Sequence, residues 1–238
     1  MVETGSSNIL GVVGGLGPLA SAEFLKTVYE WSIKKCEQEG PVVFLYSDPT
    51  FPDRTDSFLS GDGDDVLERL VKASNHLRQM GVSRILVCCV TIHYLFPRLP
   101  KEIRSQMVSL LDLIFDGVAG SSKKHLLVCS NGSRKLELFQ SHKGWKTAHS
   151  KIILPDETDQ NLIHNDLIYQ IKKNGDVNQK IKLLKSLLAK YEVDSFIAGC
   201  TEMHLVAKGF MNSGSKVNKY GCIDPLTIMA KEMAGERI

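Results

Sequence analysis

The chain carries one short pattern twice, roughly half its length apart. Residues 85–89 and 196–200 are runs of apolar or small residues that end on a cysteine, and a threonine and a histidine follow each cysteine within four residues. Short apolar runs of this kind are typical of strands buried inside a parallel sheet. Open α/β sheets bind their ligands at the carboxyl ends of such strands. The repetition therefore predicts two similar lobes, each placing a thiol at the carboxyl end of a strand.

The rest of the chain alternates strand-like runs with stretches of helical periodicity, which predicts an α/β fold of mostly parallel sheets flanked by helices. A polar, glycine-containing break at 120–124 marks the change of lobe. We expect residues 1–118 with 223–238 to form the first lobe, carrying Cys89, and residues 119–222 to form the second, carrying Cys200. Among the expected elements are helices at 97–107 and 156–173, and a loop at 212–215.

Composition limits the classes of function. The 238 residues are 43% hydrophobic and 24% charged, which is ordinary for a soluble globular protein. A net charge of +2 gives no reason to expect nucleic acid or a membrane surface as partner. No apolar run is long enough to span a bilayer and the N-terminus lacks the order of a signal peptide, so we expect a cytoplasmic protein. The six cysteines should then be free thiols, and their spacing fits no zinc site.

The two strand-end thiols suit inversion of a carbon centre. If the lobes face each other, Cys89 and Cys200 flank one carbon, and a thiolate on one side removes a proton while a thiol on the other delivers one. A free thiol has a pKa of roughly 8.5, which nearby positive charge lowers. Fixed donors must stabilise the carbanion that forms. Thr91 and Thr201 are close enough in sequence to donate to a carboxylate or thiolate.

Other interpretations of these residues stay open. A redox pair would show a CxxC motif, which is absent. Cys89 with His93, or Cys200 with His204, would suit nucleophilic catalysis, but a hydrolase needs only one such pair. Both histidines are equally well explained as helix-entry residues. Glu202 is either an acid/base helper or a carboxylate favoured at a helix start.

Two loops at other predicted strand ends offer anion-binding groups. The first, Gly14-Gly-Leu-Gly-Pro18, joins a strand to a helix and exposes backbone N–H groups, although a tight turn explains it equally well. It matches neither the dinucleotide fingerprint nor the P-loop. The second loop contains Arg54, which can fork onto a carboxylate. From the loop alone, a solvated surface arginine is the better explanation.

Four motifs together resemble the aspartate/glutamate racemase family, and aspartate racemases most closely, in order and spacing over essentially the whole chain: Gly14-Gly-Leu-Gly-Pro-Leu-Ala20, Pro52-Asp-Arg-Thr55, Cys89-Val-Thr-Ile-His93 and Gly199-Cys-Thr-Glu202. The resemblance implies a PLP-independent isomerase of two pseudo-symmetric lobes, without cofactor or metal. It also implies a homodimer with an active site between the lobes of each chain. The substrate would be a small amino acid, aspartate in the first place.

The resemblance also assigns roles to residues. Cys89 and Cys200 match the family's two acid/base cysteines, and Arg54 matches the arginine that holds the side-chain carboxylate, which reverses the preference for a solvated arginine. Lys173 resembles the lysine that assists it. Other expected substrate-binding residues are Gly15, Thr91, Ser130, Asn131, Ser133 and Thr201, with His93 and Glu202 as auxiliaries.

One departure from the family pattern concerns substrate choice. Val90 stands where family members commonly have an asparagine that contacts the polar groups of the amino acid. Two alternatives therefore remain: a relative that acts on glutamate, a hydantoin or another dicarboxylate such as maleate, and a non-catalytic carboxylate-binding homologue.

Overall fold

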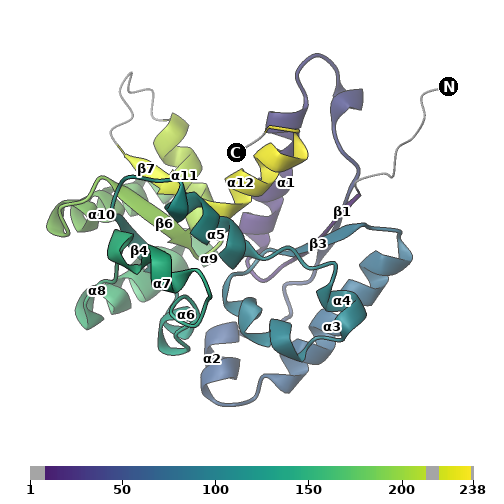
Figure 1. Ribbon diagram of the computed structural model, residues 1–238, viewed down its shortest axis with the longest axis horizontal. Helices are drawn as coiled ribbons and strands as arrows, with labels where there is room; N and C mark the ends of the chain where they lie inside the picture. Colours follow the sequence, from purple (N-terminus) through teal and green to yellow (C-terminus); the bar gives the residue numbers. More distant parts are fainter. Residues whose placement is uncertain (1–8, 213–219, 237–238) are drawn as a thin grey trace.

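The computed structural model describes residues 9–212 and 220–236. Its strands form two parallel sheets, with strand orders β2-β1-β3 and β5-β4-β6-β7 (Figure 1). The predicted α/β fold with parallel sheets flanked by helices is confirmed. The strands are β1 (Leu10–Gly14), β2 (Val43–Ser47), β3 (Arg84–Val87), β4 (His125–Cys129), β5 (Ile152–Ile153), β6 (Ser195–Gly199) and β7 (Gly221–Ile223).

Helices connect successive strands, as parallel pairing requires. The α-helices are α1 (Pro18–Ser32), α2 (Arg54–Leu59), α3 (Asp64–Gln79), α4 (Lys101–Arg104), α5 (Leu110–Ala119), α6 (Asn131–Lys135), α7 (Trp145–Ala148), α8 (Glu157–Leu162), α9 (Tyr169–Lys172), α10 (Val177–Lys190), α11 (Met203–Asn212) and α12 (Pro225–Met233). Shorter 3₁₀ segments are η1 (Glu37–Glu39), η2 (Thr91–Arg98) and η3 (His149–Lys151), and η4 (Ile163–Ile168) is a π-helical turn.

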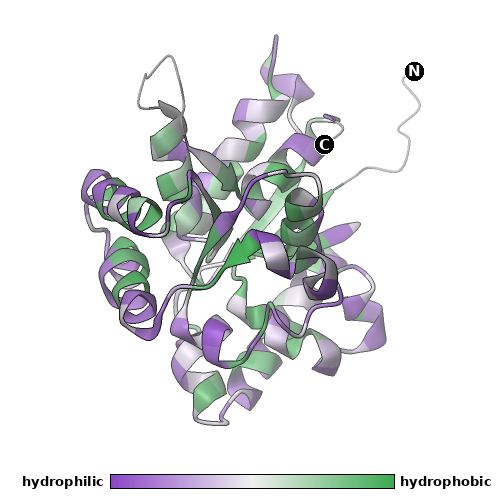
Figure 2. Cartoon of the chain, turned by 60° about the vertical axis from the view of Figure 1, so that its left-hand side comes forward, coloured by the Kyte–Doolittle hydropathy of each residue, from purple (hydrophilic) through white to green (hydrophobic). Residues whose placement is uncertain are grey.

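One central core joins the two sheets. Side chains of a strand alternate between its faces, and Leu86 of β3 and Leu127 of β4 point into the same buried cluster, to which α1, α5 and α12 contribute. The opposite faces pack separately: Val87 against α3 and η2, and Val128 against α10 and α11. Figure 2 shows this arrangement as apolar strands at the centre and helices that are polar on their outer sides. The shared core fixes the relative position of the two strand ends that carry the cysteines.

Two predicted helices differ from the structure. The helix expected at 97–107 is replaced by η2 and α4, because Pro97 and Pro100 lack the N–H that a continuous helix needs. The helix expected at 156–173 does run from α8 to α9, but η4 interrupts its α-helical phase. Of the loop expected at 212–215, Asn212 ends α11 and the remaining positions lie outside the described residues.

The C-terminal helix α12 packs against α1 and α5, on the side of the first sheet, although β7 before it pairs with β6 in the second (Figure 1). The division into lobes stays a prediction, as do the homodimer and the cytoplasmic location. No helix in residues 9–212 and 220–236 is both long and apolar enough to cross a membrane.

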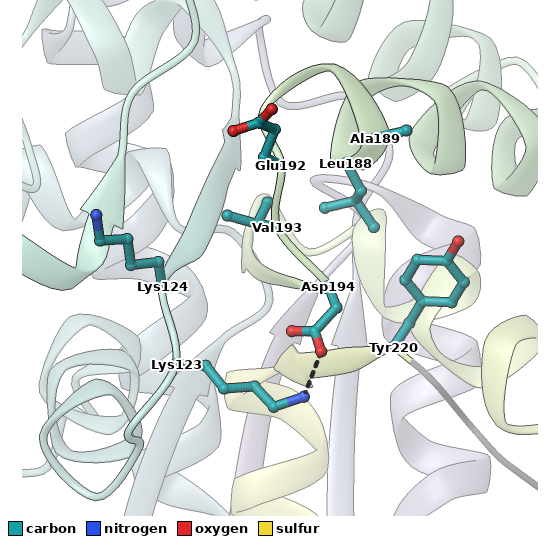
Figure 3. Close-up of a pocket in the computed structure, with 8 residues that line it drawn as sticks. All are labelled: Lys123, Lys124, Leu188, Ala189, Glu192, Val193, Asp194 and Tyr220. Carbon is teal, nitrogen blue, oxygen red and sulfur yellow. Dashed lines mark hydrogen bonds and ion pairs between the residues drawn. The ribbon is translucent and has the colours of Figure 1, made fainter.

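A hollow of about 550 Å³ lies on the second lobe, where Lys123, Asp194 and Tyr220 line it (Figure 3). These three residues come just before β4, β6 and β7, so the hollow lies at the amino edge of the second sheet. The cysteines of interest lie beyond the carboxyl ends of their strands. The hollow is therefore distinct from the candidate site described below.

Candidate active site

Cys89 and Cys200 lie just past the carboxyl ends of β3 and β6, as their sequence contexts predict. Their exposed fractions are almost equal, at 7% and 6%. Burial and the charge of Glu202 raise the pKa of Cys200 well above that of an ordinary thiol, and the charge of Cys89 adds to this increase. Because that influence requires proximity, the structure brings two thiols that are distant in sequence into one electrostatic environment.

Glu202 contacts Cys200 directly. The Sγ atom of Cys200 donates a hydrogen bond to Oε2 of Glu202 at 2.8 Å, and Glu202 is only 2% exposed. Lys172 acts in the opposite direction, since its positive charge lowers the pKa of Cys200, but the net shift remains upward. This geometry keeps Cys200 protonated.

Arg54 lies beside Cys89. It begins α2, where Nη1 donates to the carbonyl of Pro52 at 2.7 Å and Nη2 donates to the carbonyl of Leu16. Burial would lower the pKa of the guanidinium, but the charges of Cys89, Asp53 and Glu202 outweigh it and the pKa is raised. A buried cation with its position fixed by backbone carbonyls stabilises a thiolate at the neighbouring cysteine.

Asp53, next to Arg54, connects α2 to α9 on the other lobe. Its Oδ1 caps α2, while its Oδ2 accepts a hydrogen bond from the Tyr169 hydroxyl at 2.7 Å and lies 3.5 Å from Nζ of Lys172. Burial raises the pKa of Asp53, but Lys172, Tyr169 and Arg54 together lower it by more. The net shift is downward, so the carboxylate stays charged. These contacts hold α2 against α9 near the thiols.

The lysine at the site is Lys172 rather than the expected Lys173. Lys172 lies 4.2 Å from the centre of the Tyr169 ring, and the charges of Glu202 and Cys200 overcome burial to raise its pKa. Lys173 follows the last residue of α9 and is exposed. The reason is helical spacing, since residues three apart share a face and Tyr169 faces the site.

Three hydroxyl groups meet where the lobes touch. Thr91 Oγ1 lies 3.1 Å from Ser130 Oγ and 2.9 Å from Ser133 Oγ, and all three side chains are buried. Ser130 also caps α6 by accepting from the N–H of Ser133. Thr201 Oγ1 donates to the Cys88 carbonyl at 3.2 Å, again across the lobes. The structure thus brings together the hydroxyls that the resemblance assigned to a carboxylate.

The glycine-rich turn after β1 forms the wall beside Arg54. Gly15 has φ +86°, and a Cβ there would lie 2.3 Å from the backbone of Asp48, so only glycine fits. The next residue, Leu16, supplies the carbonyl that holds Arg54. Gly15 therefore shapes the site through the backbone.

Other expected residues point elsewhere. Asn131 bonds to Gln160 and Asn161 of α8. His93 lies 2.9 Å from both the Val90 carbonyl, through Nδ1, and the N–H of Leu110, through Nε2. These partners require Nδ1 to donate and Nε2 to accept. Burial lowers the pKa of His93 to about 4, so it is neutral and structural in this conformation.

Three residues of the site were not identified from the sequence: Asp53, Tyr169 and Lys172. Asp53 is part of a quoted motif, and its position as the cap before Arg54 was the available signal. Tyr169 and Lys172 follow a π turn that offsets the simple periodicity of the helix, so sequence periodicity does not indicate which side of the helix they face.

The assembled groups are two thiols, two fixed cations, one carboxylate with access to a thiol, and a cluster of hydroxyls. Such a set can bind a small anion. If a carbon atom of that anion lies between the two sulfurs, one sulfur can remove its proton and the other can deliver one. Among the residues that the structure describes, no group of three or more His, Cys, Asp and Glu side chains is placed to hold a metal ion.

Solved structures share this fold. The aspartate racemase of Picrophilus torridus superposes with a TM-score of 0.80 at 21% identity, covering 97% of this chain and 96% of that one. A glutamate racemase from Campylobacter jejuni subsp. jejuni gives 0.60 at 16% identity over 95% and 85%. An allantoin racemase from Klebsiella pneumoniae gives 0.58 at 12% identity over 96% and 87%.

The sequence itself decides the family. The model of the Asp/Glu/hydantoin racemases matches residues 13–233, a span that includes the glycine-rich turn, Arg54 and both strand-end cysteines. With this match and the shared fold, the chain belongs to the Asp/Glu/hydantoin racemase family.

Proposed function

We propose that this protein racemises aspartate without a cofactor, using Cys89 and Cys200 as a pair of acid/base groups. The observation that carries the proposal is the contact between the two strand ends: Thr201, next to Cys200, donates to the carbonyl of Cys88, next to Cys89, and both thiols are buried. Arg54 lies near one thiol and Glu202 bonds to the other. Each thiol approaches from the carboxyl end of its own strand, where α/β sheets bind ligands.

In the proposed reaction, the Cys89 thiolate takes the α-proton of the substrate and the S–H bond forms as the Cα–H bond breaks. The released electron pair is delocalised into the α-carboxylate as an enediolate. The S–H bond of Cys200 then breaks as its proton bonds to the opposite face of the carbon, leaving Cys200 as thiolate. The reverse direction exchanges the two roles. Buried cations and hydroxyl donors lower the barrier because they stabilise the charge that develops.

Two cations support a dicarboxylic substrate. Arg54 is buried and Lys172 is half-buried near the thiols, so a side-chain carboxylate on these two cations would leave the α-carboxylate to the hydroxyls of Thr91, Ser130 and Ser133. The family match and the similarity in fold to an aspartate racemase add to this assignment.

Incubation of L-aspartate with the protein in deuterated water tests the proposal. We expect D-aspartate to form with deuterium at Cα, and L-aspartate to acquire deuterium over the same period. If neither D-aspartate nor α-deuterium appears, aspartate racemisation is wrong.

A related substrate is the second candidate, and the position of Val90 is the observation that favours it. The Val90 side chain is 1% exposed and packs in the central core, so it offers no polar contact where family members commonly have asparagine. Glutamate, a hydantoin and maleate assayed in parallel would distinguish this candidate from the first. Turnover of one of them, with aspartate inert, would favour it; tight binding of a dicarboxylate without α-proton exchange would favour a non-catalytic homologue.

A further inference from the structure

Two charged groups of the site each have one atom without a partner. Oε1 of Glu202 and Nε of Arg54 are buried and make no hydrogen bond to any of the described residues. Their other polar atoms are used: Oε2 of Glu202 accepts from Cys200, and both terminal nitrogens of Arg54 donate to backbone carbonyls. Buried polar atoms of charged groups are costly to leave unpaired, so each of these two calls for an explanation.

The two atoms are complementary to a zwitterion. One is a carboxylate oxygen and accepts hydrogen bonds, and the other is a guanidinium N–H and donates them. Glu202 also interacts with Arg54, Lys172 and both Cys200 and Cys88 through its charge, so it lies among the cations and thiols rather than apart from them. A ligand with carboxylates and one ammonium would satisfy both kinds of atom.

Gly17 lies directly against the free oxygen. A Cβ at Gly17 would lie 2.1 Å from Oε1 of Glu202, closer than any side chain can approach. The φ angle of Gly17 is −176°, which any residue can adopt, so backbone conformation does not require glycine there. The close approach of Oε1 to the Gly17 backbone is the remaining local reason for glycine at this position.

We propose that Glu202 determines substrate specificity by binding the α-ammonium of the substrate through Oε1 while Oε2 holds the Cys200 thiol. Val90 packs in the core and supplies no amide for that ammonium, and Glu202 takes over this contact. The inference rests on the proposed function in that the substrate is an amino acid. It predicts that the site distinguishes an α-ammonium from an α-hydroxyl or an α-hydrogen.

Calorimetric titration with racemic aspartate, malate and succinate tests this inference, because a racemic mixture undergoes no net reaction during the measurement. Wild-type protein should bind aspartate about 10- to 100-fold more tightly than succinate, the range of one charged hydrogen bond. Glu202→Gln, which keeps the shape and removes the charge, should lose about that factor for aspartate and lose none for succinate.

A second variant, Gly17→Ala, perturbs Oε1 of Glu202 without changing Glu202 itself. Gly17→Ala should displace Oε1 and weaken aspartate binding more than succinate binding. Its control is Gly120→Ala, whose Cβ would meet only atoms at 3.7 Å or beyond and which should bind all three ligands as the wild type does. Unfolding temperatures of the variants should match that of the wild type, which shows that each variant folds.

The outcomes separate this inference from the proposed function. If aspartate is not racemised but Glu202→Gln still loses aspartate affinity selectively, the ammonium contact stands and the racemase proposal fails. Equal losses for aspartate and succinate, no loss for aspartate, or no binding of aspartate to wild-type protein would each overturn the inference.

Discussion

The two copies of the strand-and-cysteine pattern are alike in backbone and opposite in electrostatic surroundings. Cys89 follows an edge strand of the first sheet and Cys200 an inner strand of the second, yet both are exposed to almost the same extent, 7% and 6%. Cys89 lies beside the Arg54 guanidinium, whereas the Cys200 thiol donates a hydrogen bond to the Glu202 carboxylate. The carboxylate keeps Cys200 a thiol, and an inversion by two bases needs one thiol and one thiolate at the start.

The difference in electrostatic surroundings has two sources: the residue two positions after each cysteine, and a helix that is distant in sequence. Two residues after each cysteine, the first copy has Thr91 and the second has Glu202. Arg54 reaches the first cysteine from α2, outside the repeated pattern. The repeat therefore supplies matched thiols, and unmatched neighbours place a cation beside one and a carboxylate beside the other.

The largest expected effect tests whether both copies are needed. Cys89→Ser and Cys200→Ser should each reduce racemisation about 10²- to 10⁴-fold, the usual contribution of a general acid or base. Chiral chromatography of aspartate measures the loss. One-way exchange of the α-proton should survive in each variant, from the enantiomer facing the remaining thiol. Normal racemisation by either variant would show that the copies do not act as a pair.

Arg54 tests whether the first environment also selects the substrate. Arg54→Lys keeps the charge but loses the fork that matches a carboxylate, so kcat/KM for aspartate should fall about 10- to 100-fold. Kinetics with aspartate and alanine distinguish the cause, because alanine has no side-chain carboxylate. An equal loss for both substrates would mean that Arg54 serves only the thiolate.

Alkylation compares the two thiols directly. At near-neutral pH, iodoacetamide should label Cys89 about tenfold faster than Cys200, because only the thiolate reacts and burial with Glu202 raises the pKa of Cys200. The matched exposure of the two side chains controls for access. Peptide mass spectrometry measures both rates, and in Glu202→Gln the difference should narrow. Faster labelling of Cys200 in the wild type would reverse the assignment of acid and base.

The adjacent lysines at the end of α9, Lys172 and Lys173, provide an internal control for the surroundings of Cys200. Lys172→Ala removes a half-buried cation next to Asp53 and Cys200 and should lower kcat/KM for aspartate by about tenfold. Lys173→Ala changes an exposed side chain and should leave it unchanged. A loss in Lys173→Ala that equals the loss in Lys172→Ala would place the functional lysine one residue later.

The sequence predicts those parts of the site that depend on local pattern. Apolar runs ending on cysteine indicate strands, and parallel strands place Cys89 and Cys200 at the carboxyl edge of their sheets. The contact of Asp53 with Tyr169 depends instead on how two distant segments meet. The choice of Lys172 depends on helical phase after a π turn, which propensity does not reveal.

The histidines of the two copies give the smallest expected effect. His204 bonds to Asp224 and Thr27, whereas His93 bonds to two backbone groups. Burial lowers the pKa of His93 to about 4, below the value near 6.5 expected in the unfolded chain, so acid protonates the unfolded chain first. The stability that neutral His93 provides above pH 6.5 is therefore lost as the pH falls towards 4.

Between pH 7 and pH 5.5 this loss amounts to about 1 kcal/mol, or roughly 2 to 4 °C in Tm for a chain of this size. In His93→Gln, the decrease in Tm between these two pH values should be smaller than in the wild type by that amount. His125, whose pKa is also lowered to about 4 by burial, contributes the same background to both proteins. Scanning calorimetry at the two pH values measures the difference. An unchanged decrease in the variant would mean that His93 is protonated in the folded protein as readily as in the unfolded chain, which contradicts its burial as a neutral group.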